Sequence, residues 1–207
     1  AIMFRKTVIL IALLSLVPHT LAAQEKTLAA RLTPLARAHR GKMAIAVKHL
    51  DSGATFFLDE DEELPTASLI KFMIMLEVYL QASEGRVRLA DKLTLTKVNM
   101  VPGSGILTYH FSEGATFSLR DATRLMIVYS DNTATNMVLD HIGLASTNKR
   151  LDAWGFPRTR LNAKVFLGAK TSLDPERTKK FGLGSTTARE TLLLLEKVHQ
   201  GKVVNAE

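Results

Sequence analysis

Ser68 and Lys71 are the first residues whose types and spacing suggest chemistry. They stand at positions i and i+3 at the start of a long apolar segment that runs to Leu80. If this segment is a helix, both side chains lie on one face. A serine nucleophile needs a base and a site for negative charge. Free N–H groups of the first turn favour an anion, and apolar surroundings favour the neutral, basic form of a lysine.

The pair alone is weak evidence, because Ser-x-x-Lys spacing arises readily by chance. A second example, Ser146 with Lys149, follows the expected helix stop at Gly143. We therefore expect Ser146 to be an N-cap and give this second pair no catalytic role.

The triplet Ser130-Asp131-Asn132 is much rarer and falls between two helical patterns. A polar triplet at a helix junction can point into a cleft. We expect Asp131 to cap the following helix, which would fix the loop while Ser130 and Asn132 face the site.

The elements that position these residues follow from periodicity and from turn residues. The pattern predicts a helix ending near Gly41, then a β-hairpin over 43–58. The segment from Ser68 is apolar on nearly every face, which is typical of a buried central helix. Further helices are expected at 118–129, 133–142, 145–154 and 187–200, with irregular chain over 85–117 and a long polar loop over 155–185.

Taken together, these motifs resemble class A β-lactamases and related penicillin-recognising serine hydrolases. The resemblance rests on Thr66-Ala67-Ser68-Leu69-Ile70-Lys71, on Ser130-Asp131-Asn132 and on the segment Val101 to Leu107, and it covers roughly residues 25–207. It implies an α/β (α+β) fold of the β-lactamase/transpeptidase type, with a helical body, an N-terminal helix and a β-hairpin.

The resemblance also implies roles. Ser68 would attack a β-lactam or related amide carbonyl to form an acyl-enzyme, and its N–H would be half of the oxyanion hole. Lys71 would take part in removing the proton, Ser130 would pass a proton to the leaving nitrogen, and Asn132 would bind the side-chain amide of the substrate. The substrate would be a small β-lactam or a peptidoglycan-like molecule, and no cofactor is expected.

Two features depart from the family pattern. Its Lys-Thr/Ser-Gly motif is absent, because Lys170-Thr171 continues to Ser172 and precedes the last helix. We expect that motif, with its sheet strands, to come after residue 207.

The second departure is that Val165 stands where the family has the deacylating Glu. Asp174 and Glu176 are the only acids in the loop that follows. Either could swing in to act as the base, but an acid in a long loop is usually solvated.

Composition and charge argue against several other kinds of site. The chain has 207 residues, a formal charge of +7 and no cysteine, which excludes disulfides and thiolate metal sites. Lys and Arg are not interleaved with aromatic residues, so nucleic-acid binding is not expected. The six His residues lack zinc-site spacing.

The N-terminal residues predict a signal peptide. Arg5-Lys6 precede an apolar run over 7–17, and cleavage is expected after Ala22 or Ala23. This run is shorter than the ~20 residues of a membrane span. We therefore expect a signal peptide over 1–23 and a hydrolase domain over 24–207, periplasmic or secreted, monomeric and without a stable membrane anchor.

Two functional hypotheses remain open from the sequence. The motifs favour a secreted β-lactamase-like hydrolase. The missing Glu favours a relative that binds β-lactams or peptidoglycan and stays acylated.

Overall fold

A computed structural model describes residues 20–203, with side chains from residue 28 onward. The predicted signal peptide over 1–23 lies almost entirely outside these residues. The expected first helix is α1 (Thr20–Ala38). The expected hairpin consists of β1 (Ile45–Lys48) and β2 (Thr55–Leu58), antiparallel with Ile45 opposite Leu58. Its turn includes Gly53 at φ +72°, a conformation that glycine adopts without strain.

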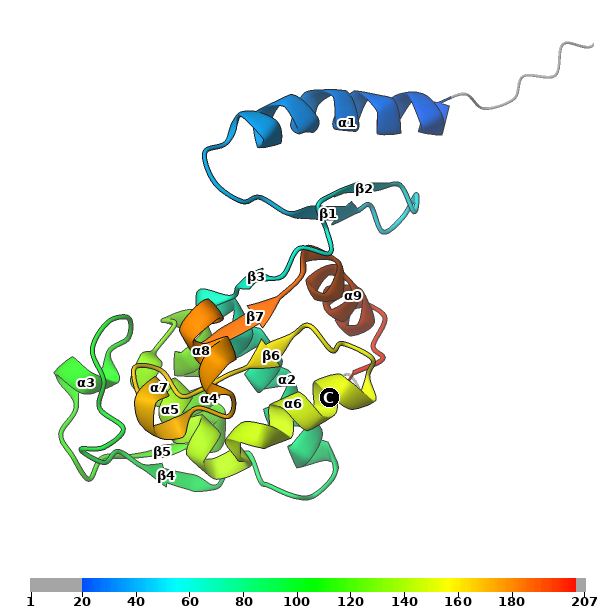
Figure 1. The fold of residues 1–207 in the computed structure, drawn as a ribbon. Coiled ribbons are helices and arrows are strands. Elements are labelled where there is room, and N and C mark those ends of the chain that lie inside the picture. The colour runs from blue at the N-terminus through cyan, green and yellow to red at the C-terminus, as the bar shows by residue number, and fades with distance from the viewer. Residues whose placement is uncertain (1–19, 204–207) are drawn as a thin grey trace, which may run out of the picture.

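Helix α1 and the hairpin stand apart from the helical body (Figure 1), and β1 contacts the body through α9 (Ala188–His199). No helix in the described part of the chain is both long and apolar enough to cross a membrane.

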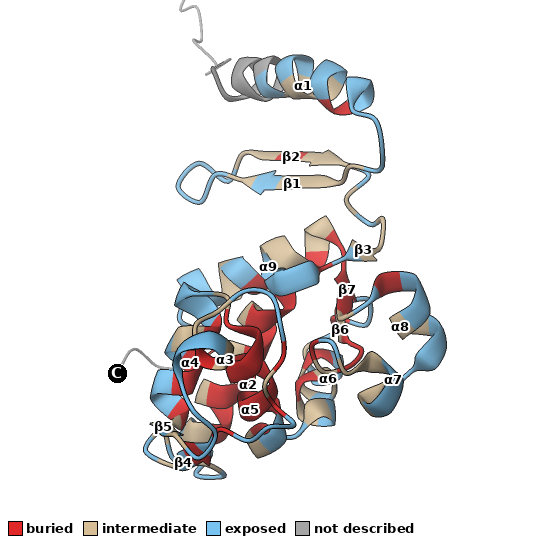
Figure 2. Ribbon diagram, turned by 90° about the vertical axis from the view of Figure 1, so that its left-hand side faces the viewer, coloured by how far each residue is buried: buried red, intermediate tan, exposed pale blue. Residues whose placement is uncertain are grey.

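The predicted buried helix is α2 (Ile70–Ser83), which lies in the centre of the body (Figure 2). Ile70, Ile74 and Val78 have no exposed surface. Helices α4 (Leu119–Val128), α5 (Asn132–Ile142) and α6 (Leu144–Ala153) pack against it, so most of α2 is buried, as its sequence predicted. One face, with Phe72, Met75 and Tyr79, is only partly buried.

Side-chain caps begin the helices where the sequence predicted them. Ser118 accepts a hydrogen bond from the Asp121 N–H at 3.0 Å at the start of α4, and Asp131 accepts from the Ala134 N–H at 2.8 Å at the start of α5. Thr187 caps α9 in the same way. Each cap satisfies a backbone donor that the first helical turn leaves free.

The irregular segment predicted over 85–117 proved more ordered than expected. It contains β4 (Lys92–Thr94) and α3 (Leu107–His110), and β4 pairs antiparallel with β5 (Thr116–Ser118). These strands are three residues long, which is too short for the alternation that marks a strand in sequence.

The loop predicted over 155–185 was also wrong in part. It contains β6 (Arg160–Leu161), α7 (Gly168–Thr171) and α8 (Pro175–Phe181), and β7 (Gly184–Thr186) follows. Strand β7 pairs antiparallel with both β6 and β3 (Leu64–Pro65). Helix α8 begins with an Asp174 cap and Pro175 in its first turn, a start that the sequence did contain.

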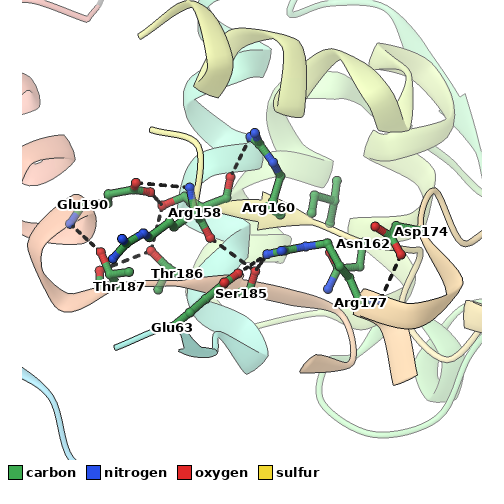
Figure 3. Close-up of polar contacts among 12 residues, drawn as sticks. Glu63, Arg158, Arg160, Asn162, Asp174, Arg177, Ser185, Thr186, Thr187 and Glu190 are labelled. Atoms are coloured by element: carbon green, nitrogen blue, oxygen red, sulfur yellow. Dashed lines mark hydrogen bonds and ion pairs between the residues drawn. The ribbon is translucent and has the colours of Figure 1, made fainter. Parts of the chain in front are cut away.

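Polar contacts fasten the two ends of this segment (Figure 3). Arg177 donates to Ser185 Oγ at 2.6 Å and pairs with Glu63, which lies just before β3. Thr159 donates to Glu190 at 2.6 Å. Since β3 leads directly into Ser68, the contact of Arg177 with Glu63 ties α8 to the chain that enters η1 and α2. The contact of Thr159 with Glu190 joins the start of the segment to α9.

Candidate active site

Ser68 lies on a short 3-10 turn, η1 (Ala67–Leu69), which continues into α2. Its side chain is exposed, and Ser130 Oγ donates to Ser68 Oγ at 3.0 Å. The preceding Ala67 adopts φ +43°, a strained conformation for a residue with a Cβ. Strain of this kind persists only where the surroundings enforce it. Here the Thr66 N–H is held by the Gly184 carbonyl at 2.9 Å.

Lys71 is buried on α2 and points toward the Ser130 loop. Its Nζ donates to the Ser130 carbonyl at 2.6 Å, to Asn132 Oδ1 at 2.8 Å and to Ser130 Oγ at 3.1 Å. Burial lowers the pKa of Lys71 from 10.5 to about 8, and the Asp131 carboxylate partly opposes this shift. The lysine can therefore lose and regain a proton near neutral pH.

The four residues predicted from the two motifs therefore come together. Ser130 sits between α4 and α5 at φ +50°, and this turn directs both its hydroxyl and its carbonyl toward Lys71. Asn132, the first residue of α5, is buried. Ser68, Lys71, Ser130 and Asn132 form one connected hydrogen-bond network.

Asp131 also holds the backbone around the site in place. Its buried carboxylate accepts from the N–H groups of Ile106 and Leu107 at 2.7 and 2.9 Å, in addition to capping α5. These hydrogen bonds hold the Gly/Pro-rich segment over 101–107 against the junction between α4 and α5. Gly105 is required at this contact, because a Cβ there would lie 2.3 Å from the Asp131 carboxyl carbon.

Asn136 is a site residue that sequence reasoning missed. Its amide donates to the Val165 carbonyl at 3.1 Å and accepts from the Val165 N–H at 2.9 Å. Asn136 is fully buried, one helical turn beyond Asn132 on the same face of α5. The available sign was an amide side chain one turn after Asn132, on the helix face predicted to point into the site, since buried polar groups need partners.

The acids of the following segment lie elsewhere, as expected. Asp174 is exposed and caps α8 by accepting from the Arg177 N–H at 3.0 Å, and Glu176 is exposed in the first turn of α8. Val165, buried and held by Asn136, carries no group that accepts a proton.

The second Ser-x-x-Lys pair is remote from this network. Ser146 lies inside α6, so its predicted N-cap role is wrong. Helix α6 begins directly after Gly143, and the Ser146 hydroxyl donates to the carbonyls of Gly143 and Ile142 at 2.6 and 2.9 Å. Lys149 is exposed. Lys170 and Thr171 end helix α7 and do not lie on a strand.

Across the described residues, no three His, Asp or Glu side chains are grouped to hold a metal ion.

Comparison with known proteins decides the family. The model of the β-lactamase enzyme family matches residues 26–207. The chain belongs to this family. A β-lactamase of Proteus vulgaris is 31% identical over 144 residues, which are 68% of this chain and 47% of that protein. The carbapenem-hydrolysing β-lactamase KPC of Klebsiella oxytoca is 25% identical, over 72% of this chain and 54% of that protein.

Solved structures of the family share the fold. The structure of PBP-A has a TM-score of 0.72 at 31% identity and covers 86% of this chain and 63% of that chain. A β-lactamase from Sphaerobacter thermophilus has a TM-score of 0.73 at 26% identity and covers 86% and 64%. The predicted membership in the penicillin-recognising serine hydrolases and the predicted fold class are thus confirmed. The chain spans about half the length of the curated relatives it matches.

Proposed function

We propose that this protein opens β-lactam amides by forming an acyl-enzyme on Ser68. The observation that carries the proposal is the hydrogen-bond chain from Ser68 through Ser130 to a buried lysine whose pKa is lowered to about 8. A nucleophilic hydroxyl, a proton relay and a base are thereby aligned without a histidine.

The proton path follows from the three contacts of Lys71. A protonated Lys71 donates all three hydrogens, whereas a neutral one keeps two. The neutral Lys71 keeps its two shorter hydrogen bonds, to the Ser130 carbonyl and to Asn132 Oδ1. Its lone pair then faces Ser130 Oγ, which lies 3.1 Å away. The Ser130 hydroxyl then gives its proton to Lys71 and takes the proton of Ser68, since a hydroxyl rotates to donate or accept.

The acylation step conserves atoms and charge. Ser68 Oγ bonds to the carbonyl carbon, and the negative charge collects on the carbonyl oxygen near the Ser68 N–H, where helix amides lack internal partners. Collapse of this intermediate breaks the carbon–nitrogen bond. The Lys71 ammonium returns the proton through Ser130 to the leaving nitrogen, and Asn132 binds the side-chain amide of the substrate.

A second candidate function is a protein that stays acylated. The supporting observation is Val165, which stands beside the network with no acid in its place. Among structural relatives, a point mutant of PBP-A has been solved as an acyl-enzyme complex with penicillin G, at 30% identity and a TM-score of 0.66. The natural acyl donor of such a protein would be a peptidoglycan-like amide rather than a β-lactam.

The same proposal includes the cellular location. The charged and apolar residues over 5–17, followed by Ala22-Ala23, support export to the periplasm or the exterior. The cleaved protein would be a monomer without a membrane anchor, which suits an encounter with small β-lactams or peptidoglycan fragments.

Two measurements on the same preparation test this function. Intact mass after incubation with penicillin G should show addition of one penicillin, and a chromogenic cephalosporin should report turnover. Labelling with turnover supports a β-lactamase, whereas labelling without turnover supports the acylated alternative. Absence of both would overturn the proposal.

A further inference from the structure

Gly184 is a buried glycine on β7 that lies against the residues on either side of Ser68. Resting on the proposed function, we infer that Gly184 is a positioning residue for the nucleophile. It acts through Thr66 and Ile70. The packing of these two residues against β7 sets where the Ser68 hydroxyl lies relative to the Ser130 hydroxyl, across which the first proton moves.

The backbone conformation of Gly184 does not itself require a glycine. Gly184 is not among the glycines with a positive φ, so a residue with a side chain could adopt the same conformation. Strand β7 is the middle strand of its sheet, between β3 and β6 (Figure 1). A glycine inside such a strand weakens it and often marks a place where another group approaches closely.

The groups that approach Gly184 belong to the nucleophile turn and to β6. A Cβ added at Gly184 would lie 2.8 Å from Thr66 Oγ1 and 3.1 Å from Ile70 Cγ1. It would also lie 2.6 Å from the carbonyl oxygen of Arg160 on β6. Thr66 stands two residues before Ser68 and Ile70 two residues after it, so the missing side chain makes room for both ends of the turn.

Backbone hydrogen bonds join the same two segments. The Gly184 carbonyl accepts from the Thr66 N–H at 2.9 Å, and the Thr66 carbonyl accepts from the Leu69 N–H at 3.0 Å. Thr66 is therefore held at both its N–H and its carbonyl, and the second bond closes the turn that contains Ala67 and Ser68. This attachment helps to keep Ala67 at its strained φ of +43°.

Packing, rather than hydrogen bonding, orients the Thr66 side chain. Only 6% of Thr66 is exposed, and its hydroxyl makes no hydrogen bond with another described residue. Ile70 has no exposed surface. Because protein interiors are close-packed, a methyl group added at Gly184 must displace these side chains, and the displacement reaches Ser68 through the turn.

The proton acceptor is held by different contacts. Lys71 donates to Ser130 and Asn132, and neither Gly184 nor Thr66 takes part in these hydrogen bonds. Misplacing Ser68 should therefore slow the transfer of its proton while the titration of Lys71 stays the same.

The test measures two quantities with penicillin G, by rapid quenching and intact mass. These are the rate constant of acylation within the enzyme–penicillin complex and the dissociation constant of that complex. The variants are Gly184→Ala, Thr66→Ala and the double variant. Gly168→Ala is the matched control, because Gly168 lies in the same 155–187 segment, has no positive φ, and its added Cβ would meet Thr178 Cγ2 at 3.2 Å.

We expect Gly184→Ala to lower the acylation rate constant by about ten- to a hundredfold, the effect of a misplacement of up to about 1 Å. The dissociation constant should change little, and the pH profile should keep its bend near pH 8, where Lys71 titrates. Thr66→Ala keeps its backbone hydrogen bonds and should acylate close to the wild-type rate. The double variant should acylate at least about threefold faster than Gly184→Ala, because the two residues are in contact.

A second pair of variants covers the case in which Gly184→Ala does not fold, which circular dichroism reports. Thr66→Leu crowds the same contact from the turn and leaves the pairing of β6 with β7 unchanged. It should lower the acylation rate constant as well, whereas Thr66→Val, which has the shape of threonine, should not. Acylation by Thr66→Leu at the wild-type rate would then refute the inference.

If Gly184→Ala folds, four results would overturn the inference. One is an unchanged acylation rate constant. Another is an equal loss in Gly168→Ala, and a third is a loss confined to the dissociation constant or accompanied by a shifted bend, since both would indicate a merely structural role. The fourth is a double variant no faster than Gly184→Ala, which would mean that the crowding acts through Arg160 and β6. If penicillin G does not label the wild type, the proposed function itself fails and this inference falls with it.

Discussion

Asn136 holds the main chain of Val165 from both sides, with one hydrogen bond to its carbonyl and one from its N–H. Asn132, one turn earlier on α5, accepts from Lys71. The same helix face therefore positions the proposed proton acceptor and Val165, the residue that we predict to stand where the family has its deacylating acid. Because the backbone of Val165 is anchored there, we expect a glutamate introduced at this position to be held on the same backbone.

The first prediction concerns release of the acyl group. We expect the wild type to give a burst of one product per enzyme followed by a slow steady state, because Val165 cannot activate water. Val165→Glu should raise the rate of acyl-enzyme hydrolysis by ~10²-fold, the low end for a positioned general base. Stopped-flow acylation followed by time-resolved intact mass measures both phases.

Val165→Gln is the matched control, because it has the size of Glu without a basic carboxylate. It should leave hydrolysis slow. Asp174→Asn and Glu176→Gln should also change little, since both acids lie exposed on α8. Rapid wild-type turnover that Asp174→Asn or Glu176→Gln abolishes would show that α8 supplies the base.

The sequence predicted the parts of this site that depend on local patterns. The all-round apolar pattern identified α2, and Ser118, Asp131 and Gly143 marked helix ends correctly, because capping acts between residues three or four apart. Two short motifs at predicted helix ends were therefore enough to predict that four residues lie together, namely Ser68, Lys71, Ser130 and Asn132.

The parts that depend on distant contacts were not predictable in this way. The pairing of β7 with β3 joins residues 64–65 to 185–186, and the Asn136–Val165 contact spans 29 positions. A strand of two or three residues is too short to show an alternating pattern in the sequence. The sequence spacing around an amide also does not reveal a hydrogen-bond partner that lies far along the chain. The cap Asp174-Pro175 of α8 was present in the local sequence and was overlooked.

The second prediction separates the two Ser-x-x-Lys pairs. Ser68→Ala should abolish covalent labelling by penicillin G, because the exposed hydroxyl bonded to Ser130 is the proposed nucleophile. Ser146→Ala should label at the wild-type rate, because the Ser146 hydroxyl only donates to carbonyls of its own helix junction. Intact mass measures the labelling of both variants. A penicillin adduct on Ser68→Ala would show that the nucleophile is another residue.

The third prediction concerns Gly105, which packs against Asp131. Gly105→Ala would place a Cβ 2.3 Å from the Asp131 carboxyl carbon, so the 101–107 segment or the helix junction must shift. Gly114→Ala is the control, since Gly114 also has a positive φ but no atom within 4 Å of a Cβ.

Denaturant unfolding should show both variants destabilised by backbone strain of ~1–2 kcal/mol. Gly105→Ala should lose about 1–3 kcal/mol more through overpacking and should also lose acylation. Equal losses of stability in the two variants would mean that the Asp131 contact does not constrain the site.

The last prediction follows from the titration of Lys71. Burial lowers its pKa to about 8, so roughly a tenth of the lysine is neutral at pH 7, some 300-fold more than at its ordinary pKa of 10.5. Only the neutral form accepts the proton that Ser130 relays. The acylation rate should therefore rise about tenfold per pH unit below pH 7, bend near pH 8 and level off above it.

The variant Lys71→Arg tests this assignment. It keeps the positive charge but cannot deprotonate in this range, so its acylation rate should be ~10²–10⁴-fold lower and its pH profile should show no bend. Acylation by penicillin G between pH 5.5 and 9.5, followed by intact mass with circular dichroism as a folding control, measures both profiles. A wild-type rate that is flat across this range, or a Lys71→Arg variant that acylates at full speed, would assign proton removal to another group.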